Sequence, residues 1–108
     1  MTDSRKQIKI YTGVVKRTTK EKECYEKEAT QLAEKLEKMK ADGKDEHDIK
    51  KQGEVLQESR SMVPDTTKRL KKAVNDLSEL LKKESDLDGT EEYTEAVAAL
   101  KAAEPHLA

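Results

Sequence analysis

Residues spaced alternately by four and three form one stripe along the first part of the chain. Its members are Tyr11, Val15, Thr18, Lys22, Tyr25, Ala29, Leu32, Leu36 and Met39. This spacing is typical of a helix that packs against another helix in the manner of a coiled coil. Thr18 and Lys22 are its weak positions. No proline interrupts the stretch, and Glu, Lys and Ala, which favour helices, dominate it. The pattern predicts a helix over about residues 8–41.

A second stripe repeats every seven residues and is more strongly apolar. It consists of Ile49, Leu56, Val63, Leu70 and Leu77, with Gly53, Arg60, Thr67, Val74 and Leu81 between them. A seven-residue repeat of this length predicts a helix over about residues 46–84 with a left-handed supercoil. Pro64 lies inside it and clashes with the carbonyl of Arg60, so we expect a bend or a local break just before it. The repeat keeps its phase across Pro64, which argues against a second loop.

Two turns separate the predicted helices. Gly43 suits the left-handed position that ends a helix, and Asp45 is a candidate N-cap for the next one. A second turn is expected over residues 85–90, with Thr90 as the N-cap of a short helix over about residues 90–104. Pro105 closes this helix. Its expected inward face comprises Tyr93, Val97, Leu100 and, more weakly, Ala103.

Short turns make consecutive helices antiparallel. The sequence therefore predicts an all-α fold. Residues 1–108 would form one elongated domain, an antiparallel up-down-up three-helix bundle. Its helices would carry an uneven charge, because residues 1–20 hold six bases and one acid, whereas residues 84–108 hold seven acids and one base. The bundle would place the basic end beside the acidic one. Two interpretations remain open: charge complementarity within the molecule, or a bipolar surface that steers a charged partner.

Composition argues against an enzyme. Charged residues make up 42% of the chain and apolar residues 33%, with no Trp or Phe, which argues against a compact α/β enzyme with a broad core. No nucleophile motif or phosphate-binding glycine loop occurs. His47 lies in an acidic turn that matches no metal site, and His106 is expected in a frayed tail. The single cysteine, Cys24, is expected to be a partly buried inert thiol in a reducing compartment. We expect no cofactor and no metal.

Nucleic acid and membranes are also unexpected partners. The basic run 68–72 could contact phosphates, but acids follow it and aromatic residues for base stacking are missing. No apolar run approaches ~18 residues, and the first residues show no apolar segment of a secretory signal. The chain is therefore predicted to be a helical module that binds another protein. A homo-oligomeric coiled coil and an adaptor bundle for an unrelated partner remain alternatives.

Several segments resemble the tubulin-binding cofactor A family along nearly the whole chain. The specific ones are residues 12–17 (TGVVKR) and residues 56–60 (LQESR) with Pro64 and Asp65 after them, and residues 91–93 (EEY) are a further match. The resemblance implies a three-helix bundle that holds a quasi-native β-tubulin intermediate after its release from the chaperonin, before αβ-tubulin forms. It also implies a cytoplasmic, cytoskeleton-associated protein without nucleotide or metal, with other tubulin-folding cofactors as further partners. Whether it is a monomer or a homodimer stays open.

The resemblance offers no catalytic set to transfer, so candidate partner-binding residues are the outward positions of the matching segments. These are Lys16, Arg17, Lys20 and Glu21 on the first helix, and Gln57, Glu58, Arg60, Met62 and Asp65 near the proline. The chain departs from the family pattern at Thr18 and Thr19, where a more apolar pair is usual, and at Gly53, where Ala is usual. Both departures should weaken the local core.

Overall fold

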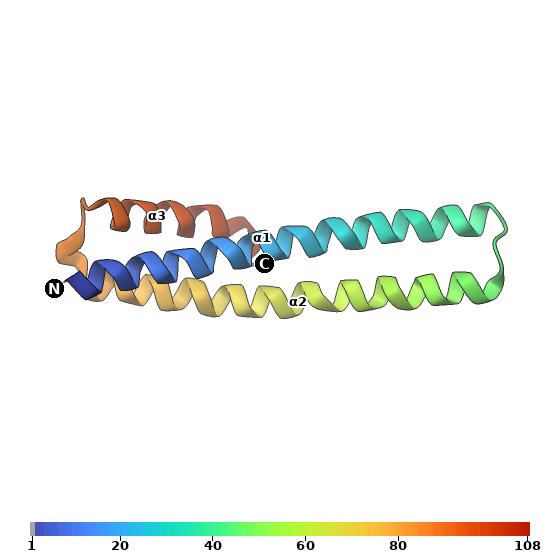
Figure 1. Ribbon diagram of the computed structural model, residues 1–108, viewed down its shortest axis with the longest axis horizontal. Coiled ribbons are helices and arrows are strands. Elements are labelled where there is room, and N and C mark those ends of the chain that lie inside the picture. Colours follow the sequence, from blue (N-terminus) through green and yellow to red (C-terminus); the bar gives the residue numbers. More distant parts are fainter. Residues whose placement is uncertain (1) are drawn as a thin grey trace.

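Three α-helices and two short 3₁₀ turns form the chain in the computed structural model, which describes residues 2–108. Helix α1 spans Thr2–Ala41, α2 spans Glu46–Lys83 and α3 spans Glu91–Ala103. The 3₁₀ turn η1 (Ser85–Leu87) precedes α3, and η2 (Glu104–His106) follows it. The predicted all-α, up-down-up bundle is confirmed (Figure 1). Helix α1 begins earlier than the expected start near residue 8.

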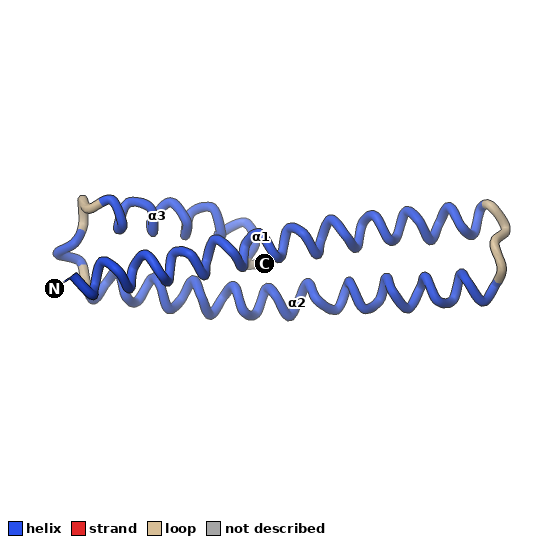
Figure 2. Tube along the Cα trace, viewed as in Figure 1, coloured by secondary structure: helices blue, strands red, loops and turns tan. Residues whose placement is uncertain are grey.

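The molecule is a rod. Its principal extents are 64 × 21 × 16 Å, and its radius of gyration is 19.2 Å, against about 13 Å for a compact domain of this size. Helices α1 and α2 form a hairpin along the whole rod (Figure 2). The shorter α3 lies against only one half of it, so the chain ends about midway along the rod (Figure 1).

The first turn contains a glycine in the left-handed conformation, as predicted. Gly43 has a φ of 67°, the left-handed conformation that glycine adopts without strain. The amide of Lys44 donates to the carbonyl of Met39, and the amide of Gly43 donates to that of Lys40. This pair of bonds is a Schellman motif, which satisfies carbonyls at the end of α1. Asp45 occupies the N-cap position of α2, but its side chain makes no capping hydrogen bond.

The second turn also ends in the predicted cap. Gly89 has a φ of 95°, and Thr90 follows it as the N-cap of α3. The Thr90 hydroxyl accepts a hydrogen bond from the Tyr93 amide at 3.3 Å and donates to the Leu87 carbonyl at 2.8 Å. Thr90 therefore joins η1 to α3 and sets the direction in which α3 returns along α1.

The main core lies where all three helices meet. Ile8 and Val15 of α1 and Leu70 and Leu77 of α2 are fully buried there. Helix α3 contributes three alanines, Ala96, Ala99 and Ala103. Because these side chains are small, α3 packs close to the hairpin.

One expected core position is wrong, and another lies only at the edge of the core. Val97 is 44% exposed, because α3 turns Ala96, Ala99 and Ala103 inward, with Tyr93 and Leu100 packing at the edges of this face. Tyr11 is 37% exposed, whereas the stripe that packs in α1 runs through Ile8 and Val15. Helical spacing identified both helices and much of the buried face of α1, where Val15, Thr18 and Lys22 are buried, but it misplaced Val97 of α3.

Helix α2 continues through Pro64 without a second loop, as the phase of its repeat predicts. Of the two outcomes expected at this proline, a local break is excluded. One position of the repeat is wrong: Arg60 is exposed, and the neighbouring Ser59 is buried in its place. The charged side chain thereby stays hydrated, and the small serine takes the buried position.

The remaining part of the rod is a two-helix arm, residues 27–62, which α3 does not cover. Within these residues only Leu56 and Ser59 are buried, and the other apolar positions of the two stripes are half-buried. The Ser59 hydroxyl is enclosed without a hydrogen-bond partner. The arm is therefore held by a thin seam and leaves most of its surface to solvent.

The buried threonines of α1 are satisfied within their own helix. The hydroxyls of Thr18 and Thr19 each donate at 2.8 Å to the carbonyl four residues earlier. Thr12 does the same toward Ile8. These bonds remove the free-energy cost of an unpaired buried hydroxyl. The threonines still bury less apolar surface than the more apolar pair that is usual in the family pattern. That the Thr18–Thr19 pair weakens the core stays a prediction.

Candidate partner-binding surface

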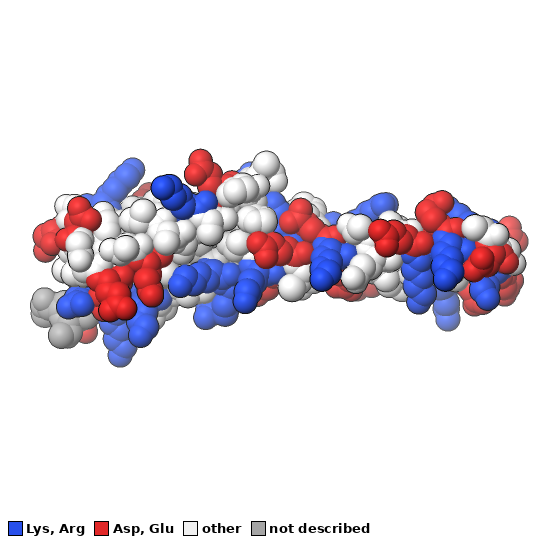
Figure 3. Space-filling view, turned by 90° about the horizontal axis from the view of Figure 1, so that it is seen from above, with Lys and Arg blue, Asp and Glu red and all other residues white. Residues whose placement is uncertain are grey.

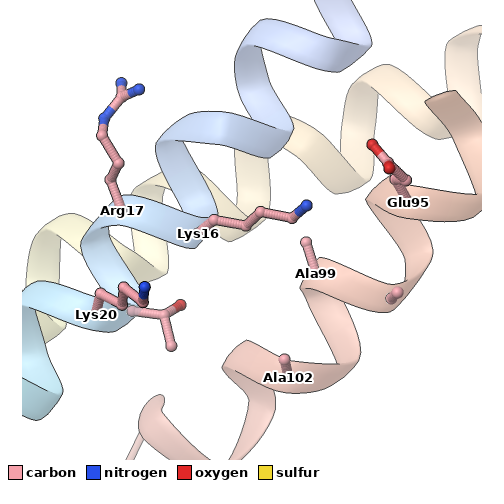
Figure 4. A pocket seen from close by; sticks show the side chains of 8 residues that line it. Lys16, Arg17, Lys20, Glu95, Ala99 and Ala102 are labelled. Atoms are coloured by element: carbon pink, nitrogen blue, oxygen red, sulfur yellow. The ribbon is translucent and has the colours of Figure 1, made fainter.

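A groove separates the outer sides of α1 and α3 in the three-helix half of the rod. It encloses about 510 Å³. Three of the predicted residues line its α1 side, and alanines with one glutamate line its α3 side. The lining residues are Lys16, Arg17, Thr19, Lys20, Glu95, Ala98, Ala99 and Ala102. Figure 4 shows the side chain of Lys16 extending toward α3, with Glu95 and Ala99 across the gap.

The cations of this half of α1 are mostly unpaired. Residues 4–20 contain six Lys and Arg residues and no Asp or Glu. Only Arg5 forms an ion pair within the described chain, with Glu92 of α3. The five without one are Lys6, Lys9, Lys16, Arg17 and Lys20. Positive charge is thus concentrated on the solvent side of α1, beside a part of α3 that carries alanines and the single acid Glu95.

The Arg5–Glu92 pair confirms that the basic start of the chain meets its acidic end. The Arg5 guanidinium donates from Nε at 3.1 Å and from a terminal nitrogen at 2.8 Å to one Glu92 oxygen. These hydrogen bonds lower the pKa of Glu92. On α2, a hydrogen bond from Lys72 to Asp76 raises the pKa of the Lys72 ammonium. Part of the charge complementarity is therefore internal.

Two further predicted residues share one cation. A terminal nitrogen of Arg69 on α2 lies 3.1 Å from a Glu21 oxygen on α1, and its Nε lies 3.7 Å from an Asp65 oxygen. The groups are about half exposed, so each pair contributes under about 1 kcal/mol. The main consequence is geometric, because Arg69 connects the predicted surfaces of α1 and α2.

The predicted residues of α2 fall on two different faces. Glu58, Met62, Asp65 and Arg69 are spaced by four, three and four residues and share one face. That face continues onto α1 through Glu21. Gln57 and Arg60 share another face, on the opposite flank of the helix.

Arg69 thus links two of the nine predicted residues, Glu21 and Asp65, across the hairpin, and helical spacing places five more near them on the outer surfaces of α1 and α2. The antiparallel pairing of residue 21 with residue 69 places the α2 group beside α1 residues 25–32. Its centre is about 15 Å from that of the α1 group at 1.5 Å per residue. We refer to Lys16, Arg17, Lys20, Glu21, Met62, Asp65 and Glu58 as the charged band.

Sequence reasoning missed the contact that holds the end of the chain. Lys22, only 4% exposed, donates from Nζ to the backbone carbonyl of His106 and, at 3.4 Å, to that of Ala108. The His106 ring nitrogen Nε2 lies 3.1 Å from a Glu23 oxygen. His106 was expected in a frayed tail, and η2 instead packs on α1. The usable signal was Lys22, a lysine at a core position, since a buried ammonium needs acceptors.

Other candidate sites find no support in the described chain. Among residues 2–108, no group of three or more His, Cys, Asp and Glu side chains could hold a metal ion. Cys24 is exposed and not partly buried as expected, because it lies on the solvent side of α1. In the basic run 68–72, Arg69 and Lys72 are paired with acids. None of the described helices is both long and apolar enough to cross a membrane.

Charged side chains cover most of the rod, interrupted by uncharged surface over its α3 half (Figure 3). An elongated helical bundle with such a surface defines a class of protein that works by contact with another macromolecule through helix faces. Comparison with known proteins specifies the class further. The sequence pattern of the family described as "Tubulin binding cofactor A" matches residues 3–100, and the chain belongs to this family. It is a family of cofactors and not of enzymes.

Relatives in animals and plants support this membership. The chain is 57% identical over 102 residues to tubulin-specific chaperone A of Gallus gallus, covering 94% of each chain. Its structure is similar to that of human tubulin chaperone cofactor A, with a TM-score of 0.82, 51% identity and coverage of 94% and 98%. It is also similar to tubulin folding cofactor A from Arabidopsis thaliana, with a TM-score of 0.89, 36% identity and coverage of 97% and 99%.

Proposed function

We propose that this protein is a tubulin-folding cofactor that binds and stabilises a quasi-native β-tubulin intermediate after release from the chaperonin, on the way to the αβ-tubulin heterodimer. The observation that carries the proposal is membership of the family over residues 3–100. Relatives that the chain matches along nearly their whole length are named tubulin-specific chaperones.

The shape of the molecule is compatible with a holding role. A folding intermediate exposes apolar surface and unpaired backbone that lead to aggregation. A rod of 64 Å can lie along such a surface and cover it without enclosing it. Polar and charged contacts favour reversible binding, because they speed association and contribute less affinity than buried apolar anchors. The cofactor would then release β-tubulin without a nucleotide.

We infer that the charged band is the surface that contacts β-tubulin, together with Gln57 and Arg60 on the other flank of α2. Exposed side chains on rigid helices are already positioned for binding and lose little backbone entropy. The protein would act in the cytoplasm, near the cytoskeleton, as a monomer or a homodimer. Other tubulin-folding cofactors would compete for, or receive, the bound β-tubulin.

The test is complex formation with chaperonin-released β-tubulin, followed by native gel or gel filtration, with native αβ-tubulin as the comparison. We expect a complex with released β-tubulin and a weaker one, or none, with the heterodimer. If β-tubulin migrates alone at every protein concentration, the assignment to tubulin folding is wrong.

Single substitutions then test the surface. Glu58→Ala and Arg60→Ala should each weaken the complex by about 2- to 10-fold, the range of rim contacts. Glu79→Ala and Lys82→Ala are matched controls, since both residues are exposed on α2 near the opposite end of the helix. Equal losses in all four variants would show that these positions do not form a specific surface.

A further inference from the structure

We propose that the groove between α1 and α3 receives an acidic helical segment of the partner protein. This inference deepens the proposed function and rests on it, because it states the chemistry of the partner surface. The carboxylates of the segment would pair with Lys16, Arg17 and Lys20, and its small apolar side chains would contact Ala98 and Ala102.

The first argument is that some basic side chains of the rod have an ion-pair partner and those of the groove do not. Arg5 and Arg69 each have an acid within 3.1 Å, whereas Lys16, Arg17 and Lys20 have no ion pair within the described chain. All three are exposed and line the same groove. Glu95 on the opposite side is the only acid of the lining. The groove therefore has a surplus of positive charge that an acidic partner would complement.

The second argument is that the floor of the groove, formed mainly by alanines of α3, is apolar. Ala98, Ala99 and Ala102 present methyl groups, and the one hydroxyl, that of Thr19, already donates to the Val15 carbonyl. The floor thus offers few free polar groups to orient a small polar ligand, although the groove's volume of about 510 Å³ lies within the ~300–1,000 Å³ range of ligand sites. Methyl groups suit the close approach of another helix.

The third argument is spacing. Lys16 and Lys20 are four residues apart, so their side chains are neighbours on one face of α1, one turn apart. Acidic residues four apart on a helix that lies along the groove repeat at the same interval. Such a helix could make both ion pairs at once.

The experiment uses the full chain and a labelled peptide of about 15 residues, long enough to form helix, with glutamates four apart beside an alanine face. The triple variant Lys16→Gln, Arg17→Gln, Lys20→Gln should bind this peptide at least about tenfold more weakly at low salt, and with a smaller salt dependence. The control triple Lys35→Gln, Lys38→Gln, Lys51→Gln changes the charge equally on the exposed two-helix arm, and it should bind like the unmodified chain.

A second variant blocks the floor without touching the charges. Ala98 and Ala102 are exposed, so Ala98→Leu with Ala102→Leu should leave the circular dichroism spectrum unchanged and weaken the peptide at every salt concentration. Equal binding by all variants overturns the proposal, as does equal binding of a peptide with lysine in place of glutamate. An RNA oligonucleotide of equal charge that binds as tightly would show a general polyanion surface and would also overturn it.

The same variants separate this inference from the proposed function. If the unmodified chain binds released β-tubulin and the groove variants bind it as well as the control triple, the groove proposal fails and the function stands. If the peptide binds in the groove but β-tubulin does not bind the unmodified chain, the function fails. If the groove triple abolishes self-association of the chain alone in sedimentation, a second copy is the occupant, which overturns the partner assignment.

Discussion

Replacing Gly53 by alanine should stabilise the protein. Gly53 lies inside α2, in the two-helix arm, and a Cβ built on it meets no atom within 4 Å. Its φ is not in the left-handed region, so alanine can adopt the same backbone. Glycine in a helix interior costs about 1 kcal/mol relative to alanine, because the unfolded chain loses more freedom on folding. The expected gain in the free energy of unfolding is therefore about 1 kcal/mol.

The matched control is the same substitution at Gly43. A Cβ there also meets nothing within 4 Å, but Gly43 has a φ of 67°. Alanine in this conformation is strained by about 1–2 kcal/mol, so Gly43→Ala should destabilise the chain although both sites have open space. The opposite signs would come from backbone conformation alone.

The assay is thermal and urea unfolding followed by circular dichroism at equal protein concentration. A change of 1 kcal/mol corresponds to about 4–8 °C in Tm for a domain of this size. A lower Tm for Gly53→Ala would refute the reasoning, since it would mean that α2 needs the glycine, for example for a closer approach of α1. A higher Tm for Gly43→Ala would show that the first turn is not held in the left-handed conformation.

Three further substitutions test the packing, the second cap and the internal charge pair. Leu70→Ala removes a fully buried side chain and should cost about 2–5 kcal/mol in urea unfolding; a loss under 1 kcal/mol would show that the core is not where the helices meet. Thr90→Ala removes the hydroxyl that caps α3 and should cost about 1 kcal/mol, with Thr94→Ala, an exposed threonine inside α3, as its control. The pKa of Glu92 is lowered by Arg5, so this pair stabilises the fold above the ordinary carboxyl value of 4.5 and the effect is lost as pH falls through the lowered pKa. The Tm difference between the unmodified chain and Glu92→Gln should accordingly shrink between pH 7 and pH 3, and a constant difference would contradict this assignment.

The candidate surface was only partly predictable, and particular residues show why. Glu58, Met62 and Asp65 share a face because of their spacing, which the sequence contains. Their connection to Glu21 depends on Arg69, whose position across the hairpin follows from the register of α1 against α2. The alanine floor of the groove went unpredicted, since Ala98 and Ala102 carry no chemical signal until α3 is docked.

The charge at the two ends of the chain shows the same division. The excess of bases in residues 1–20 and of acids in residues 84–108 is a property of the sequence. It predicted that the ends meet, and the pair of Arg5 with Glu92 confirms this. Which cations stay unpaired, however, depends on where α3 lies, and the burial of Lys22 against η2 depends on the same docking.

The sequence by itself determined the three helices, the two turns and the antiparallel topology. Helical period, glycine at the left-handed position and the Thr90 cap act over a few residues, so they can be read locally. Only the tertiary structure decided that α3 buries Ala96 and not Val97, that it covers half of the hairpin, and that a basic groove remains beside it. These features arise from packing between segments far apart in the chain, where small differences in side-chain volume select one helix face over another.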